Sequence, residues 1–212
     1  MSANRLIMFI GLVACTTAAL AEGEKNSQVF FRGAYSRLTT SRGGEVFTDT
    51  AGAAGTNGKK GGYSVAAGVD LALTPSKGFL NFGTLIGEIF TEYSRFSHQT
   101  VRQTTSALLA GTANSDVSVS QMNVTVAPKL RIDVSESVRP YVIPAGVAWL
   151  VNSPPSNDST YLDMGIPFAV GVDFPIVSQL SLGADARYTY AFNHSNTHNS
   201  YYSVGAYAGI NF

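Results

Sequence analysis

A strict alternation of bulky and small side chains from Leu162 to Phe174 limits the fold more than any other feature of this sequence. In LDMGIPFAVGVDF the bulky apolar residues occupy the even positions, and Asp, Gly, Pro or Ala occupy the odd positions. A period of two residues is typical of a β-strand with two unlike faces. At about 3.3 Å per residue the segment is ~40 Å long, enough to cross a bilayer at a tilt of about 45°.

The same period recurs along the rest of the chain and predicts eight strands. Their ranges are Val29–Arg37, Tyr63–Leu73, Gly83–Phe96, Met122–Ile132, Arg139–Val151, Leu162–Phe174, Gln179–Tyr190 and Tyr202–Phe212. The third range is the least regular, because its apolar Ile86 and Phe90 share a face with Glu88 and Glu92. In the other strands the second face carries mainly glycine, alanine, serine and isolated charges, which suits a narrow lumen.

The predicted connections alternate between short and long. The short ones are Thr74–Gly78, Ser135–Ser137 and Pro175–Ser178, and the long ones are Leu38–Gly62, Ser97–Val117, Asn152–Thr160 and Asn193–Ser200. Bacterial outer-membrane barrels sort tight periplasmic turns from long external loops in this way. We therefore predict an all-β fold, an eight-stranded antiparallel up-and-down transmembrane β-barrel in the bacterial outer membrane, with both termini periplasmic.

Composition favours the membrane barrel over its alternative, a secreted soluble barrel or sandwich. Charged residues make up 13% of the chain, against about 25% in soluble domains, and no later apolar run reaches the ~20 residues of a spanning helix. Aromatic residues near the strand ends are expected to form interfacial girdles. They are Tyr35, Tyr63, Tyr93, Tyr141, Trp149, Tyr188, Tyr190, Tyr202 and Phe212.

The N-terminus has the pattern of a signal peptide over residues 1–21, with residues 22–212 forming the barrel. Arg5 precedes an apolar run, and Ala19-Leu20-Ala21 is a small-residue cleavage site, so we expect cleavage after Ala21. In the alternative, Leu12-Val13-Ala14-Cys15 is a lipobox and Cys15 carries the lipid. The first interpretation is favoured because a barrel needs no acyl anchor. It leaves no cysteine, which excludes disulfides, cysteine metal ligands and a thiol nucleophile.

Net charge bears on the choice of partner. Without Arg5 the chain carries 13 Lys and Arg against 14 Asp and Glu, and this near-neutrality argues against nucleic acid, which requires a clustered basic surface. We predict outer-membrane lipid and lipopolysaccharide as partners, and no cofactor.

The last strand, YYSVGAYAGINF, carries a family resemblance. Its Ala208, Ile210 and terminal Phe212 resemble the C-terminal assembly signal of outer-membrane barrels, which implies recognition by the barrel assembly machinery. VRPYVIPAGVAWL (Val138–Leu150) and QLSLGADARYTY (Gln179–Tyr190) resemble strands five and seven of the OmpA-like eight-stranded family, which includes opacity-type surface proteins. The resemblance implies a structural or surface-interaction role, such as adhesion or host contact. Two-domain members continue into a peptidoglycan-binding domain, and we expect none here.

The face that is predicted to line the lumen carries the candidate site residues, a charge network of Arg32, Glu88, Glu92, Lys129, Arg131, Asp185 and Arg187. An eight-stranded barrel is just wide enough for side chains to fill it, and buried charges must be paired. We therefore interpret the network as a plug, with Glu88, Glu92, Arg131 and Arg187 at its centre. The alternative is a small-solute channel whose network rearranges.

A second alternative is an enzyme. His198-Asn199-Ser200 resembles the His-x-Ser pair of lipid A deacylases, which are also eight-stranded outer-membrane barrels. The glutamate of that family follows the pair in the chain, whereas this sequence has no Glu after Glu136. We therefore predict no catalytic residue. His194 and His198 have no carboxylate nearby in the sequence, so no metal site is predicted either.

The long connections are polar and rich in Gly, Ala, Ser and Thr, as in TDTAGAAGTNGKKGG and HQTVRQTTSALLAGTANSD. Two interpretations remain open for them. They are either a surface that binds a host or surface ligand, or solvated connections without a partner.

Overall fold

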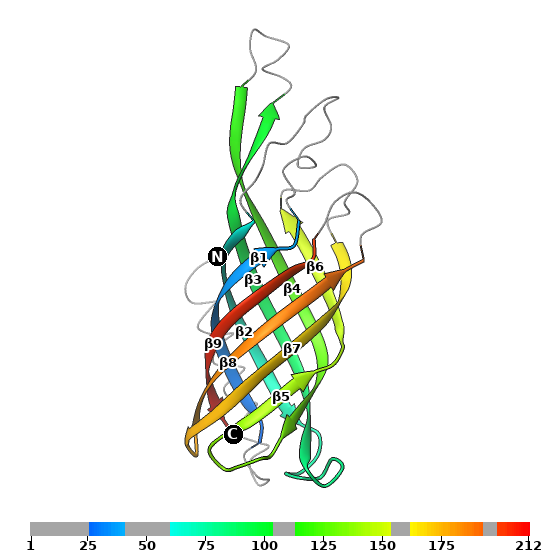
Figure 1. Ribbon diagram of the computed structural model, residues 1–212, viewed down its shortest axis with the longest axis vertical. Coiled ribbons are helices and arrows are strands. Elements are labelled where there is room, and N and C mark those ends of the chain that lie inside the picture. Colours follow the sequence, from blue (N-terminus) through cyan, green and yellow to red (C-terminus); the bar gives the residue numbers. More distant parts are fainter. Residues whose placement is uncertain (1–25, 41–59, 104–112, 154–161, 193–198) are drawn as a thin grey trace, which may run out of the picture.

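The computed structural model describes residues 26–40, 60–103, 113–153, 162–192 and 199–212. These residues form one antiparallel sheet that closes into a barrel, with strands tilted about its long axis (Figure 1). The strands are β1 (Gln28–Leu38), β2 (Gly61–Ala72), β3 (Gly83–Gln103), β4 (Ala113–Ile132), β5 (Arg139–Ile143), β6 (Val147–Ser153), β7 (Leu162–Val177), β8 (Leu180–Ala191) and β9 (Tyr201–Asn211). None of the described segments contains a helix long and apolar enough to cross a membrane.

The barrel closes where the first strand meets the last. β1 pairs with β2 on one side and with β9 on the other, from Gln28 opposite Asn211 to Leu38 opposite Tyr201. β5 and β6 occupy one position between β4 and β7, so the nine segments fill eight positions around the ring. The predicted all-β antiparallel barrel is confirmed.

The predicted strand Arg139–Val151 is broken in the middle. Residues 144–146, Pro-Ala-Gly, leave the sheet, and the pairing with both neighbours shifts by one residue across the gap. Proline has no N–H to donate to the ladder. Pro144 therefore accounts for the end of β5, and the wall is irregular at this point.

The predicted connection Ser97–Val117 is wrong for most of its length. β3 continues to Gln103 and β4 begins at Ala113, and the two strands extend as a ribbon beyond the rest of the barrel (Figure 1). The ladder changes register between Arg95 and His98 and then resumes. Serine, threonine and valine are abundant in this stretch, and the β-branched residues among them favour extended backbone, so a polar segment that reads as a loop pairs as a hairpin.

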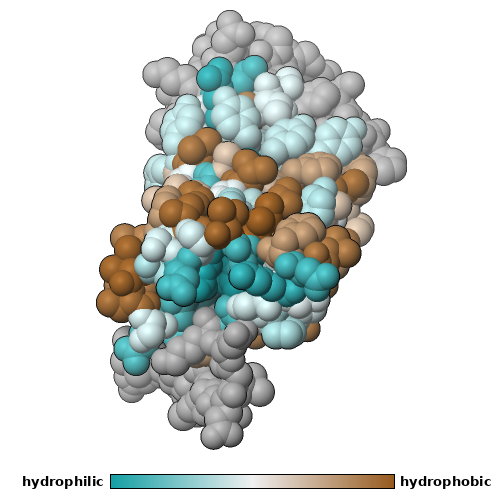
Figure 2. Space-filling model, turned by 60° about the horizontal axis from the view of Figure 1, so that its bottom comes forward, coloured by the Kyte–Doolittle hydropathy of each residue, from teal (hydrophilic) through white to brown (hydrophobic). Residues whose placement is uncertain are grey.

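The two faces of the wall differ in chemistry. Large apolar side chains point outward along every strand position, and Figure 2 shows them gathered in a band across the wall, bordered by more polar residues. Six girdle tyrosines are outward and exposed: Tyr35, Tyr63, Tyr93, Tyr188, Tyr190 and Tyr202. The prediction for Tyr141 is wrong, because this side chain is 3% exposed and faces the lumen. The absence of a side chain at Gly171 leaves room for its ring.

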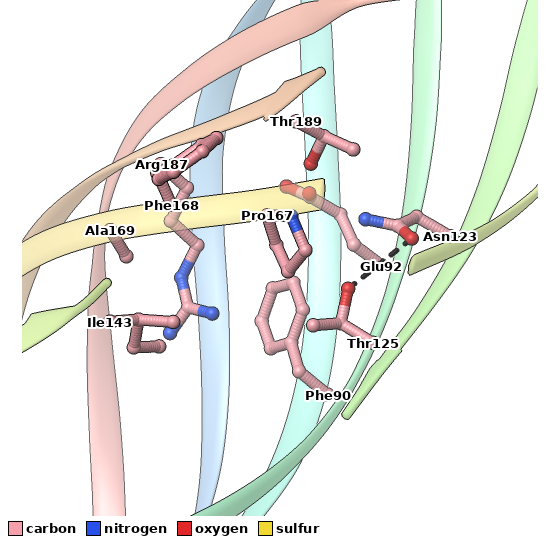
Figure 3. A pocket seen from close by; sticks show the side chains of 10 residues that line it. All are labelled: Phe90, Glu92, Asn123, Thr125, Ile143, Pro167, Phe168, Ala169, Arg187 and Thr189. Carbon is pink, nitrogen blue, oxygen red and sulfur yellow. Dashed lines mark hydrogen bonds between the residues drawn. The ribbon is translucent and has the colours of Figure 1, made fainter. Parts of the chain in front are cut away.

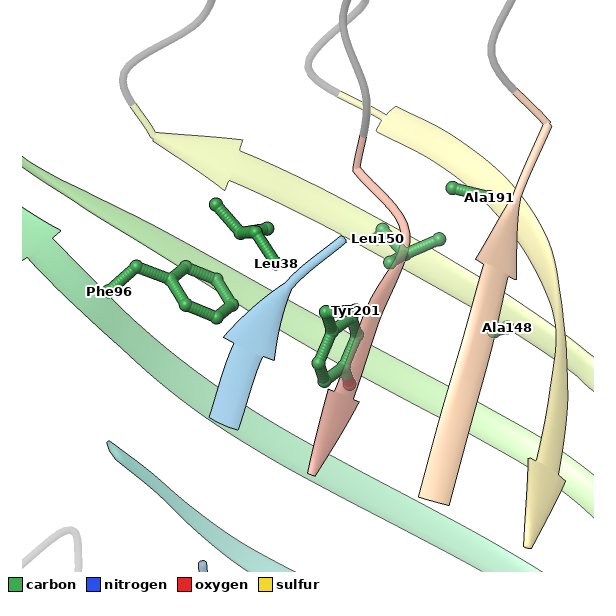
Figure 4. Packing of buried hydrophobic residues seen from close by; sticks show 6 residues of the cluster. All are labelled: Leu38, Phe96, Ala148, Leu150, Ala191 and Tyr201. Atoms are coloured by element: carbon green, nitrogen blue, oxygen red, sulfur yellow. The ribbon is translucent and has the colours of Figure 1, made fainter. Parts of the chain in front are cut away.

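The lumen contains aromatic and aliphatic side chains that the small-residue pattern did not predict. Phe30, Phe90, Tyr141 and Tyr207 form one buried cluster. A second cluster lies toward the loop end and contains Leu38, Phe96, Ala148, Leu150, Ala191 and Tyr201 (Figure 4). The inner face therefore carries more large side chains than the expected glycine, alanine, serine and isolated charges.

Candidate functional site in the barrel lumen

The inward residues of β1 give the order of layers along the lumen. Starting at the end where β1 lies beside the C-terminal residues of β9, they are Gln28, Phe30, Arg32, Ser36 and Leu38, all buried. Gln28 belongs to a layer around Lys129, Arg32 to the central layer, and Leu38 to the apolar cluster at the loop end. These three layers succeed one another along the lumen, from the turn end to the loop end.

The central layer is a chain of alternating charges that crosses the barrel. Arg187 binds both oxygens of Glu88 at 2.6 and 3.1 Å and contacts Asp185 at 2.8 Å. Asp185 in turn pairs with Arg32. The Nη2 atom of Arg32 lies 2.6 Å from Oδ1 of Asp185, and the Nε–H of Arg32 donates a hydrogen bond to the same oxygen at 2.7 Å. Arg32 reaches Glu92 at 3.0 Å. All five side chains are buried, and charge-assisted contacts of this kind are about twice as strong as neutral ones.

Neutral side chains complete the central layer. Ser64 Oγ and Tyr201 OH donate to the two oxygens of Glu92 at 2.6 and 2.7 Å, and Tyr141 OH donates to Asp185 at 3.0 Å. Figure 3 shows Glu92 and Arg187 on either side of Phe90, with Asn123 and Thr125 close by. The cavity among them is only about 10 Å³, which is about the size of one water molecule. Side chains therefore pack closely around this cavity.

A second layer surrounds the ammonium group of Lys129. Lys129 Nζ lies 2.8 Å from Asp70, 3.7 Å from Asp173 and 3.8 Å from the centre of the Tyr141 ring. Gln28 also donates to Asp70, and the Tyr207 hydroxyl donates to Asp173. Since Tyr141 also donates to Asp185, it connects this layer to the central chain.

Arg131 lies apart from both layers, at the end of the barrel that carries the β2–β3 and β4–β5 turns. It contacts Asp133 at 3.2 Å and donates to Asn26 and Thr84. Asp133 lies just outside the strands. Partial burial alone would raise the pKa of Asp133, but hydrogen bonds from Thr84 and the Lys77 N–H, together with the charge of Arg131, lower the pKa overall.

The loop end of the lumen holds neutral polar groups. Ser94, Gln121 and Asn152 are register partners across β3, β4 and β6, so their side chains are neighbours on the inner face. Ser94 Oγ, Gln121 Oε1 and both polar atoms of the Asn152 amide have no hydrogen-bond partner among the described residues, although all three residues are buried.

The structure brings five of the seven predicted lumen residues into one chain: Arg32, Glu88, Glu92, Asp185 and Arg187. Lys129 is in the adjoining layer. Arg131 does not join the centre, because it lies four residues beyond Ala127, the register partner of Glu88, which is about 13 Å along a strand. Arg32 takes the place that was predicted for Arg131.

Several participants were missed by the sequence analysis. They are Gln28, Ser64, Asn123, Tyr141, Tyr201 and Tyr207. Gln28 lies on the same face of β1 as Arg32, and Ser64 lies on the same face of β2 as Asp70. The positions of the charged residues could therefore have identified both. Tyr201 lies one residue before the predicted start of its strand.

The residues of the enzyme alternative are only partly described. Ser200 is buried, and its hydroxyl accepts a hydrogen bond from the N–H of Ala191 at 3.0 Å. Cys15, Ala21, His194 and His198 lie outside the described residues. In the part of the chain that the structure describes, no three His, Cys, Asp or Glu side chains are arranged to hold a metal ion.

At the C-terminus, Ala208 and Ile210 point outward and are exposed, and Phe212 is half-buried. The outward pair forms part of the apolar outer wall beside β1 and β8.

A closed antiparallel barrel with an apolar outer wall and a polar interior is the architecture of outer-membrane barrels. The sequence matches the family model for the outer membrane protein beta-barrel domain over residues 7–208. The chain belongs to this family and therefore to the bacterial outer membrane. Comparison with curated proteins gives no match.

Solved structures with the same fold include Neisserial surface protein A, with a TM-score of 0.56 and 14% identity over 90% of this chain and 100% of that one. Outer membrane protein OprG from Pseudomonas aeruginosa has a TM-score of 0.51 and 12% identity over 90% and 98% of the two chains. The outer membrane enzyme PagL has a TM-score of 0.50 and 12% identity over 88% and 99%. At these identities the likeness shows the fold alone.

Proposed function

We propose that this protein is a structural and surface-interacting barrel of the outer membrane whose lumen is plugged by its own side chains. The observation that carries the proposal is the chain of ion pairs from Glu92 through Arg32, Asp185 and Arg187 to Glu88, which crosses the interior without a break. Opening a pore there would separate buried opposite charges, which is costly. A barrel of this kind acts through its outer wall and its loops.

In this proposal residues 1–21 are a signal peptide, removed after Ala21, and both termini face the periplasm. The assembly machinery reads Ala208, Ile210 and Phe212. The connections after β1, β3, β6 and β8 then face outward, as loops that carry adhesion or host contact. A catalytic role is disfavoured because Ser200 is buried and its hydroxyl is engaged by Ala191.

The experiment combines outer-membrane fractionation, heat-modifiable gel mobility and conductance in planar bilayers. We expect the protein in the outer-membrane fraction, a heat-dependent mobility shift, and no single-channel steps. Regular steps from the wild-type protein would overturn the plug.

One observation bears on the channel alternative. Among the described residues, the two charged layers contain five carboxylates (Asp70, Glu88, Glu92, Asp173, Asp185) and three cations (Arg32, Lys129, Arg187). By count, these layers therefore hold two more acidic side chains than basic ones. Any conductance that is found should favour cations, and reversal potentials in a salt gradient measure that preference.

A further inference from the structure

A groove of about 440 Å³ lies in the outer wall, across β5, β7, β8 and β9. Its wall is almost entirely apolar and includes Val170, Ala186 and Val204 on one side and Phe168, Tyr188 and Tyr202 on the other. These side chains are on the lipid-facing surface. The short side chain of Ala186 forms the floor of the groove. At one end of the groove the wall is irregular, because residues 144–146 leave the sheet.

Strand register shows that two parallel rows of side chains line this groove. The first row runs through Val142, Val170, Ala186, Val204 and Tyr35. The second runs through Phe168, Tyr188, Tyr202 and Arg37. Neighbours in such a row have Cβ atoms about 5 Å apart, so Arg37 stands directly beside the tyrosine end of the groove.

The tilt of the strands gives these rows a direction. On the near side of Figure 1, β9 lies above β8 and β8 lies above β7, so a row that crosses from β7 to β1 rises toward the loop end. Arg37 is the last residue but one of β1 and is exposed. The groove therefore leads from the apolar middle of the wall to a cation at its rim.

A second outward cation lies near the first. In the row of Val204 and Tyr35, the next partners are Tyr63 and then Arg95, which is also exposed. Arg37 is on β1 and Arg95 is on β3, two strand spacings or about 10 Å apart across the sheet. Tyrosines lie between them and the groove.

We propose that this surface binds lipid A, the phosphorylated glycolipid of the outer leaflet, with one acyl chain in the groove and phosphate on Arg37. An apolar groove fits an acyl chain, and a guanidinium pairs with phosphate through parallel hydrogen bonds. Lipid A carries phosphates at both ends of its disaccharide, which matches two separated arginines better than the single phosphate of a phospholipid does. The inference rests on the proposed function for the outward orientation of the loop end.

Native mass spectrometry of the full-length protein in mild detergent tests this directly, with purified bis-phosphorylated lipid A or phosphatidylglycerol as the added lipid. Ala186→Phe fills the floor of the groove. Ala184→Phe is the matched control, because Ala184 is exposed on the same face of β8 but does not line the groove. Arg37→Gln removes the cation at the rim.

We expect the wild type and Ala184→Phe to bind lipid A equally. Ala186→Phe should weaken binding about tenfold, the effect of losing contact with roughly two CH₂ groups, and Arg37→Gln should also lower it. Equal binding by Ala186→Phe and the wild type overturns the groove, and phosphatidylglycerol binding as tight as that of lipid A overturns the choice of ligand. Heat-modifiable mobility and outer-membrane fractionation of each variant show separately whether the barrel itself is intact.

Discussion

The charged layers of the lumen and the neutral layer near the loops differ in how their buried polar groups are paired. In the central and Lys129 layers, every charged side chain has an oppositely charged partner within 4 Å. In the layer toward the loops, Ser94, Gln121 and Asn152 are neutral, and within the described part of the chain each has a polar atom without a hydrogen bond. A buried unpaired charge costs far more than a buried unpaired amide. We therefore expect that breaking a charged layer destabilises the barrel more than a change in the neutral layer does.

The largest effect is expected from breaking the central chain at Arg187. Arg187→Met leaves Glu88 and one oxygen of Asp185 without their cation, and we expect a loss of about 3 to 5 kcal/mol in the free energy of unfolding. Urea unfolding in lipid vesicles measures this loss, with Trp149, the only tryptophan, as the fluorescent reporter. The double variant Glu88→Leu/Arg187→Met should recover part of the loss, since the stranded carboxylate is then removed. A single variant as stable as the wild type would contradict the importance of the charged layers.

A smaller loss is expected from crowding the aromatic cluster that supports these layers. A Cβ at Gly183 would collide with the Tyr207 ring, whose hydroxyl binds Asp173. We expect Gly183→Ala to cost about 1 to 3 kcal/mol through displacement of the ring. Gly33→Ala is the control, since nothing lies within 4 Å of a Cβ at that position. Equal unfolding curves for the two variants would show that the Tyr207 ring can move without a loss in the free energy of unfolding.

The fold could be predicted because a strand with one face in lipid must carry apolar residues at every second position. This period of two can be seen within each short segment of the sequence. The same register placed Arg32, Glu88 and Arg187 on the inner face. It could not say which of them meet, because partners such as Arg32 and Asp185 are brought together by the closure of β1 onto β9 and by side-chain length.

Other errors have local causes. Tyr141 was assigned to the girdle because tyrosine is common at interfaces, whereas the space beside Gly171 admits it to the lumen. The polar composition of the β3–β4 ribbon predicts a loop, whereas its backbone pairs as a hairpin. Composition therefore misled where register and neighbouring side chains decided the outcome.

A still smaller change in stability is expected from a substitution in the neutral layer. Asn152→Leu removes an amide whose two polar atoms have no partner in the segments that the structure describes, so we expect unchanged stability or a gain of up to about 1 kcal/mol. Asn123 provides the contrast, because its amide donates to Tyr201 OH at 2.9 Å. Asn123→Leu should cost about 1 to 2 kcal/mol in the same urea titration. If Asn152→Leu is the more damaging of the two, its amide has a role that the described contacts do not contain.

The smallest effect is expected at the turn end, outside the membrane-spanning strands. The folded-state pKa of Asp133 is lowered from its ordinary 3.8, because hydrogen bonds from Thr84 and the Lys77 N–H, with the charge of Arg131, outweigh the effect of burial. A lowered folded pKa means that the ionised group stabilises the native state above the unfolded pKa, and that this contribution disappears as pH falls through the folded value.

Stability should therefore fall slightly below about pH 4, by about 1 kcal/mol, because Asp133 then loses the charge that Arg131 and its hydrogen-bond donors stabilise. Asp133→Asn should remove that part of the pH dependence while leaving the charged layers of the lumen unchanged. The difference between the unfolding free energies of the wild type and Asp133→Asn, measured from pH 6 to pH 2.5, isolates this contribution from the other carboxylates. A difference that stays constant across that range would show that the contacts of Asp133 at the turn end do not favour its ionised form.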